Sequence, residues 1–337
     1  MIYKDLKGRP HALVTSLLTA QSLGLSFGEE LSKDGMSDRE VIQKAIDSLP
    51  GGGRILIKRG LYDLGEEGLQ IPYPSHFFIE GEGFDPYPEV LERVYKDGWS
   101  YGGTCLLYRG KGHAIYFGPK EAKKGVDPRA TLELSNIAVR VKGGAKSAIC
   151  LKYVNYAIFE CVGVATEGPS LAGISIEGEG GGTKFLKVLL IQGPFYVGLN
   201  LFTEHVLVMK AQIEGYRGWA MKLWRDCKVV SAVIRTKDGR AKGGVFTYPV
   251  KCPKRFKRSP PPLNKDEHWR ASYPVTLVNV FDESEGVGQG YVSFLANGAH
   301  LVLVGCGKNP KLKARLYAAQ NGGKVDTTAQ VLKESRR

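Results

Sequence analysis

A unit of about two dozen residues recurs through the middle of the chain, and this period constrains the fold more than any other feature. Each unit has a small residue, then an apolar residue, any residue and a second apolar residue, and successive units lie 25, 25, 22 and 24 residues apart. The five units are Ala148–Leu151, Gly173–Ile176, Gly198–Leu201, Ala220–Leu223 and Gly244–Thr247.

A second strand-like unit keeps step with the first. Its apolar pairs are Val139/Val141, Val162/Val164, Leu189/Ile191, Ala211/Ile213 and Ala232/Ile234. Two strand-period units in each repeat, with no helical period between them, predict an all-β coil of short parallel strands. A leucine-rich repeat is the competing interpretation, but its framework of Leu and Asn does not recur here. Alternation predicts two inward columns, Ile174/Leu199/Met221/Val245 and Ile176/Leu201/Leu223/Thr247.

The remaining segments are expected to flank or interrupt the solenoid. Apolar residues at helical spacing predict a capping helix over Ser37–Leu49, with Ser37 or Asp38 as N-cap. We expect an N-terminal segment over 1–30, a β-helix domain over 31–306 and a basic C-terminal tail over 307–337. A basic, proline-rich insertion is expected over 249–274, and short helices around Leu312–Ala319 and Thr327–Lys333 are expected to cap the open end.

The start of the solenoid resembles a known family. Asp34-Gly35-Met36-Ser37-Asp38, the helix, Pro50–Ile57 and Gly60-Leu61-Tyr62 look like the opening of right-handed parallel β-helix proteins of the pectate-lyase superfamily, which includes polygalacturonases and phage tailspike-like depolymerases. Gly81–Gly83 and Gly103–Leu106 fit the strands and turns that follow. The resemblance covers about Lys33 to Thr247 and implies a single-stranded, right-handed parallel β-helix. It says little about a reaction, because this fold hosts many functions.

Motifs for catalysis are sparse. Pectin-hydrolysing relatives carry paired aspartates and a Gly-His-Gly, and this chain has no Asp-Asp, Asn-Thr-Asp or Gly-His-Gly. The run Ile234–Lys237, followed by Gly239-Arg240 and Gly243-Gly244, is similar to the clamp that holds a substrate carboxylate in those enzymes. That resemblance implies an anionic-group clamp of Arg217, Arg235 and Lys237, and the alternative is a solvated basic turn.

One outward column offers a candidate catalytic pair. Ala165, Gln192, Glu214 and Arg235 are predicted to occupy it, with Glu167 beside it. Glu214 and Glu167 would serve as acid and base beside Arg235, although two rungs separate them by ~10 Å. The alternative is an exposed salt bridge of little energetic consequence.

A second outward column is rich in aromatic residues. Its predicted members are Lys152, Glu177, Phe202, Trp224 and Tyr248, next to Asn200 and Lys222. Large rings in register on an external face are typical of surfaces on which sugar rings stack. The alternative is that a loop or another subunit covers them. The column therefore predicts a glycan-binding or interface site.

Charge and cysteine usage bound the partners. The net charge is +13, but residues 249–274 hold seven Lys/Arg against two Asp/Glu, and residues 307–337 hold eight against two. The remaining body is nearly neutral, which disfavours nucleic acid as a partner. Six scattered cysteines form no C-x-x-C pair, and few acidic residues cluster, so we expect no metal and no cofactor. The disulfide state of the cysteines stays open.

No apolar run is long enough for a membrane span, and polar residues interrupt Ala12–Phe27, so we expect no signal peptide and leave the location open. Eight Asn and eight Gln in 337 residues favour a thermophilic source.

The sequence favours a glycan-binding or surface spike-type structural module without strong catalytic activity. The alternative is a polysaccharide hydrolase or lyase acting on acidic glycans. A homo-oligomer, such as a trimer, or a place in a larger particle is also expected.

Overall fold

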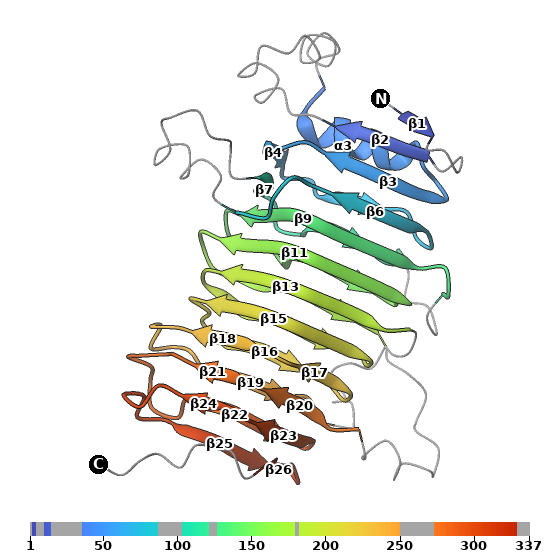
Figure 1. Cartoon of the computed structure of the whole chain (residues 1–337). Helices are drawn as coiled ribbons and strands as arrows, with labels where there is room; N and C mark the ends of the chain where they lie inside the picture. Colours follow the sequence, from blue (N-terminus) through green and yellow to red (C-terminus); the bar gives the residue numbers. More distant parts are fainter. Residues whose placement is uncertain are drawn as a thin grey trace.

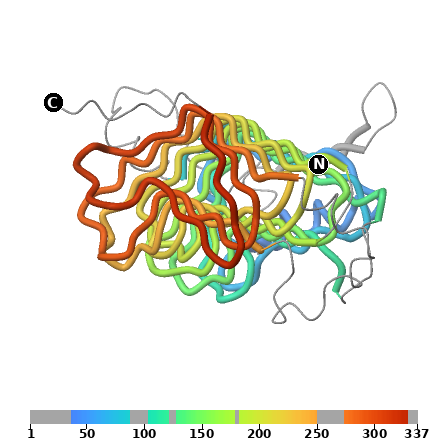
Figure 2. The backbone as a smooth tube through the Cα atoms, turned by 90° about the horizontal axis from the view of Figure 1, so that it is seen from below, coloured from blue at the N-terminus to red at the C-terminus, as the bar shows by residue number. Residues whose placement is uncertain are grey.

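The chain forms a solenoid of stacked coils, shown from the side in Figure 1. The computed structural model describes residues 2–4, 10–14, 36–86, 103–120, 127–178, 182–249 and 273–328. Seen along the solenoid axis in Figure 2, successive coils lie over one another. The predicted parallel β-helix architecture is therefore confirmed.

One wall of the solenoid is a nine-stranded parallel sheet, here called sheet B, which takes one strand from each coil. Its strands are β5 (Leu69–Ile71), β8 (His113–Phe117), β10 (Ser147–Lys152), β12 (Ser170–Glu177), β14 (Phe195–Phe202), β16 (Trp219–Leu223), β19 (Gly243–Thr247), β22 (Val292–Asn297) and β25 (Arg315–Gln320).

The other walls belong to a seventeen-stranded sheet, here called sheet A. Its strands are β1 (Ile2–Lys4), β2 (Pro10–Val14), β3 (Gly52–Ile57), β4 (Gly60–Gly65), β6 (His76–Glu80), β7 (Thr104–Tyr108), β9 (Thr131–Val141), β11 (Tyr156–Thr166), β13 (Lys184–Gln192), β15 (Val206–Glu214), β17 (Cys227–Val229), β18 (Ala232–Arg235), β20 (Val275–Val278), β21 (Val280–Asp282), β23 (His300–Val304), β24 (Gly307–Lys308) and β26 (Lys324–Thr327). The long strand β15 pairs with both β17 and β18, so one long strand in the middle coils occupies the place of two short strands in the later coils.

The register of sheet B follows the first repeat unit. Ile174 pairs with Leu199, Leu199 with Met221, and Met221 with Val245. These side chains and those of the second inward column are fully buried, as predicted. Each buried aliphatic side chain contributes about 1.5–3 kcal/mol relative to exposure, so the stacked columns form the core.

The predicted register of the second repeat unit is confirmed among four coils, and the unit that starts at Val139 is displaced. Val162 pairs with Ile137 and Val164 with Val139, so the alignment of Val139/Val141 with Val162/Val164 is wrong by two residues. A displacement of two residues keeps every side chain on its face, so strand alternation alone cannot detect it.

The predicted capping helix is confirmed as α3 (Asp38–Asp47). Ser37 is the N-cap and forms a capping box with Glu40, an arrangement worth about 1 kcal/mol. The buried side chains of Ile42 and Ile46 face the core, and α3 contacts β2, β3, β4 and β5 at the N-terminal end of the solenoid (Figure 1).

The C-terminal end differs from the prediction. The helix expected around Leu312–Ala319 is wrong, because Arg315–Gln320 forms strand β25, which pairs with β22. The segment is rich in helix formers, but the free edge of β22 offers backbone partners that outweigh local propensity. The helix expected near Thr327–Lys333 lies mostly outside the described residues, since these end at Thr328.

Other predictions also fall partly outside the described residues. Of the basic insertion, residues 250–272 lie outside them, and of the N-terminal segment only β1 and β2 are described. Within the described residues, five cysteines are free thiols, namely Cys105, Cys150, Cys161, Cys227 and Cys306. No helix in the described part is long and apolar enough to cross a membrane.

Candidate functional site

The outer face of sheet B brings together the residues of the predicted aromatic column. Lys152 pairs with Glu177 and Glu177 with Phe202, while Asn200 pairs with Lys222 in the neighbouring outward column. Strands of a sheet stack about 4.8 Å apart, so these side chains form rows parallel to the solenoid axis.

A chain of hydrogen bonds links these rows. The Tyr248 hydroxyl donates to Asn200 Oδ1 over 2.7 Å, and Asn200 Nδ2 donates to Ser175 Oγ over 2.8 Å. Ser175 Oγ in turn donates to Glu177 Oε1 over 2.8 Å, and Lys152 Nζ lies 3.7 Å from Glu177 Oε2. Burial raises the pKa of Tyr248 well above its usual range, so its hydroxyl stays a donor. The polar groups of this face are therefore held in fixed positions.

The three aromatic residues of the column pack on one another. The rings of Phe202 and Trp224 stack with centroids 4.9 Å apart, and Tyr248 meets Phe202 edge to face at 5.1 Å. Only 6% of Phe202, 2% of Trp224 and 9% of Tyr248 is exposed. This arrangement matches the alternative in which the rings are covered, and it leaves little ring surface for a ligand.

The burial of these three rings also affects the prediction of a homo-oligomer. The expectation of a homo-oligomer depends on these rings leaving water when subunits associate and on the basic insertion over 249–274, most of which lies outside the described residues. Because the rings are already buried in a single chain, they offer no such gain, and oligomerisation stays a prediction.

The open part of this face lies around Tyr196, which is 41% exposed. Lys222 Nζ lies 5.8 Å from the centre of the Tyr196 ring, and Lys242 Nζ lies 5.5 Å from it. Lys222 also lies over the rings of Phe246 (5.5 Å) and Tyr248 (5.9 Å). Burial, together with the positive charge of Lys242, lowers the pKa of Lys222.

The sequence analysis missed Tyr196 and Lys242, although the repeat contains their signal. Both occupy the position two residues before the small residue of the repeat unit. The residues at this position in the five units are Lys146, Leu171, Tyr196, Gly218 and Lys242. The four residues of the unit do not include this position, so the unit alone does not identify the row.

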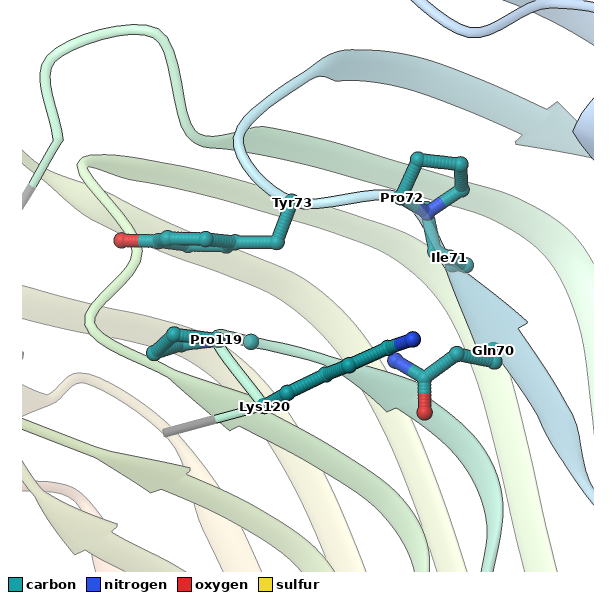
Figure 3. A pocket seen from close by; sticks show the side chains of 7 residues that line it. Gln70, Ile71, Pro72, Tyr73, Pro119 and Lys120 are labelled. Carbon is teal, nitrogen blue, oxygen red and sulfur yellow. The ribbon is translucent and has the colours of Figure 1, made fainter. Parts of the chain in front are cut away.

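A hollow of about 350 Å³ lies at the β5 and β8 end of the same face. Figure 3 shows the Lys120 side chain extending toward Gln70, and the Tyr73 ring lies on the other side of the hollow. Gln70 pairs in register with Tyr116, which places the hollow at the N-terminal end of the row that contains Asn200 and Lys222. The Tyr73 hydroxyl donates to the Tyr153 carbonyl over 2.7 Å, which fixes the ring. The lining residues are Gln70, Ile71, Pro72, Tyr73, Gly118, Pro119 and Lys120.

The predicted catalytic column on sheet A has the expected register. Ala165 pairs with Gln192, Gln192 with Glu214, and Glu214 with Arg235. Arg235 Nη2 donates to Glu214 Oε1 over 2.6 Å.

Glu167 has different partners from Glu214. Lys142 Nζ donates to both of its carboxylate oxygens, over 2.8 and 2.9 Å, and Arg140 Nε lies 3.5 Å from Oε1. Glu214 is thus held by one cation and Glu167 by two others, as in the salt-bridge alternative, and no contact between the two glutamates is found among the described residues.

The three residues of the predicted clamp each have an acidic partner. Arg217 Nε lies 3.3 Å from Asp238 Oδ2, and Lys237 Nζ lies 3.8 Å from Glu285 Oε2, while Arg235 pairs with Glu214. The clamp residues are therefore distributed over three ion pairs. A second hollow of about 300 Å³ adjoins two of them, lined by Arg235, Lys237, Phe281, Glu283, Glu285, Asn309 and Pro310.

The sequence analysis also missed Phe281 and Glu283. Phe281 pairs with Val233, and the Glu283 N–H donates to the Ile234 carbonyl, so Glu283 follows Arg235 on the next rung. The insertion interrupts the period before these residues, and continuing the ladder beyond it would have found them.

A group of buried polar residues lies inside the same coils. Asp282 pairs with Ile234 and continues its inward column. Tyr291 donates to Asp282 Oδ2 over 3.0 Å, and the Tyr291 and Tyr216 hydroxyls lie 2.6 Å apart. Tyr216 is fully buried. This group is a structural element of the interior.

The chain matches no protein-family model, no curated protein and no solved structure. The parallel β-solenoid is confirmed, and membership of the pectate-lyase superfamily stays a prediction.

Proposed function

We propose that this β-solenoid is a glycan-binding module that holds a polysaccharide along the outer face of sheet B. The observation that carries the proposal is the exposed ring of Tyr196 next to Lys222, on the same face as the hydrogen-bonded group that holds Glu177 and Asn200 in place. A sugar chain presents hydroxyl groups and apolar ring faces at a regular spacing. Fixed polar groups on rungs about 4.8 Å apart, with an aromatic ring at their side, complement such a ligand.

The rigidity of the surface supports the same function. These side chains stand on strands of a continuous sheet and are locked by one another, so little conformational entropy is lost when a ligand binds. The hollow beside Tyr73 adds a concave end to the row that contains Asn200 and Lys222. A surface spike or particle protein that attaches to glycans would use the face in the same way.

The test is a glycan array followed by titration calorimetry on the best ligand. Tyr196→Ala is expected to weaken binding about tenfold, which corresponds to about 1.4 kcal/mol. Tyr156→Ala is the matched control, because Tyr156 is 47% exposed but belongs to β11 in sheet A. Equal affinities of the two variants would contradict the proposed face, and binding to no polysaccharide would contradict the function.

A second candidate function is hydrolysis of a polysaccharide at the sheet A hollow. Its support is that Glu214 and Glu283 flank Arg235 on successive rungs, which places their backbones about 9.6 Å apart. Side chains that lean toward Arg235 would bring the two carboxyl groups into the range of about 6.5–9.5 Å that inverting glycosidases use. Glu283 makes no side-chain hydrogen bond or ion pair with another described residue, which leaves its carboxylate open to a ligand.

A reducing-end assay on neutral and uronic-acid polymers tests this candidate. Activity that Glu283→Gln and Glu214→Gln abolish, and that Glu167→Gln retains, would support the new pair over the one expected from the sequence. Activity unchanged in all three variants would refute both assignments.

A further inference from the structure

Two ammonium groups share one exposed aromatic ring on the outer face of sheet B. Lys222 Nζ and Lys242 Nζ lie 5.8 and 5.5 Å from the centre of the Tyr196 ring. Neither ammonium makes a hydrogen bond or an ion pair with another residue in the part of the chain that the structure describes. The cations of the predicted clamp differ, since Arg217, Arg235 and Lys237 each face a carboxylate.

The backbone makes this pairing possible. Gly218 lies between Tyr196 and Lys242 in the row, because the Lys242 N–H donates to the Gly218 carbonyl over 2.8 Å. A Cβ on Gly218 would lie 2.3 Å from the Tyr196 carbonyl oxygen, so this rung has no side chain. Lys242 can therefore reach across it to the Tyr196 ring.

Lys222 is held from its other side. Its ammonium lies over the rings of Phe246 and Tyr248 as well as Tyr196, and its side chain is half-buried. Ring faces attract cations, but they do not neutralise charge. Two positive groups beside one ring repel each other, and the lowered pKa of Lys222 reflects its burial and the charge of Lys242.

We propose that Tyr196, Lys222 and Lys242 form a binding site for an anionic oxygen group, a carboxylate or a sulfate, carried by a sugar ring that lies against Tyr196. Such a group accepts hydrogen bonds from the two ammonium groups and offsets their mutual repulsion, and the exposed part of Tyr196, 41% of the residue, is available to the sugar. The glycan part of this inference rests on the proposed function, whereas the anion site itself does not.

The first experiment measures the site without a polymer. Inorganic sulfate and monomeric galacturonic acid are titrated into the full chain, and the lysine Cε resonances are followed by NMR. The resonances of Lys222 and Lys242 are expected to move and saturate together, while that of Lys210, an exposed lysine on β15, serves as the control. Resonances of Lys222 and Lys242 that move no more than that of Lys210 would overturn the anion site, whether or not glycans bind.

The second experiment tests the ligand class with polygalacturonate, dextran sulfate and neutral dextran. The wild type is expected to prefer one of the two charged polymers, and Lys222→Met and Lys242→Met are each expected to weaken that binding about tenfold. Methionine keeps the apolar stem on the rings, and Lys210→Met is the control. A preference for the carboxylated or the sulfated polymer identifies the anion.

The outcomes separate the two proposals. If a variant that carries both Lys222→Met and Lys242→Met binds a charged polymer as tightly as the wild type, the anion site is refuted and the glycan function remains. If sulfate saturates the site but no polymer binds, the proposed function is refuted and the anion site remains.

Discussion

A lysine lies inside the solenoid, and its removal is expected to stabilise the protein. Lys184 pairs in register with Ala157 and Val206, both buried, and its own side chain is 0% exposed. Its ammonium donates to the Glu204 carbonyl over 3.4 Å. Burial lowers the pKa of Lys184 to about 8, against the opposing charge of Glu204.

The magnitude follows from this lowered pKa. A fall from 10.5 to about 8 corresponds to a cost of roughly 3 kcal/mol for the charged form at neutral pH. Lys184→Met removes that cost and also removes the polar contacts of the ammonium, which include the hydrogen bond to the Glu204 carbonyl and are together worth about 1–2 kcal/mol. We therefore expect a net gain of about 1–2 kcal/mol in the free energy of unfolding at pH 7, provided that methionine fills the same volume.

The free energy of unfolding is expected to depend on pH differently in the wild type and in the variant. Between pH 8 and 10.5 the unfolded chain binds the Lys184 proton and the folded chain does not, so wild-type stability rises with pH across this window. The variant lacks this rise, and its advantage shrinks accordingly. Urea unfolding of both proteins at several pH values measures the difference, in which the ionisation of buried tyrosines cancels. An advantage that is independent of pH, or a variant less stable than the wild type at pH 7, would refute the reasoning.

Three further perturbations have defined outcomes. Trp224→Ala is expected to lower the free energy of unfolding by about 3–5 kcal/mol, because the ring is buried against Phe202; a variant with wild-type stability in urea would contradict this packing. Tyr291→Phe removes the hydroxyl that donates to Asp282, and the buried carboxylate it leaves is expected to cost about 1–3 kcal/mol; an unchanged unfolding midpoint would show that the bond is not formed. Gly218→Ala is expected to displace the backbone of Tyr196 and weaken glycan binding with a smaller effect on the unfolding midpoint; undiminished affinity would place the ligand elsewhere.

The fold could be predicted because each sequence repeat corresponds to one coil of the solenoid. The small residue that starts each unit on sheet B marks close contact with neighbouring backbone or side chains, as at Gly198, where a Cβ would lie 2.6 Å from Ile213. This constraint fixes the register of sheet B. The pairs on sheet A lack such a marker, which is why the alignment at Val139 was displaced by two residues.

The site could be predicted only in part, because ladder position does not determine burial or partners. The rows containing Glu177, Asn200 and Lys222 follow from register, but the covering of Trp224 depends on side-chain packing. Likewise, Glu214 and Glu167 are near each other in the ladder, but each is bound by a cation that the alternation does not identify. The strand β25 was missed for a related reason, since the edge that it joins exists only after β22 is in place.

The central claim is that a polysaccharide lies along several rungs of sheet B, and the most direct test is affinity as a function of oligosaccharide length. Calorimetry with a length series of the best glycan is expected to give a dissociation constant that falls with each added sugar and then reaches a plateau, once the ligand spans the outer face of sheet B between the Tyr73 hollow and Tyr196. A monosaccharide that binds as tightly as the longest chain, or a series in which no length binds, would contradict the account.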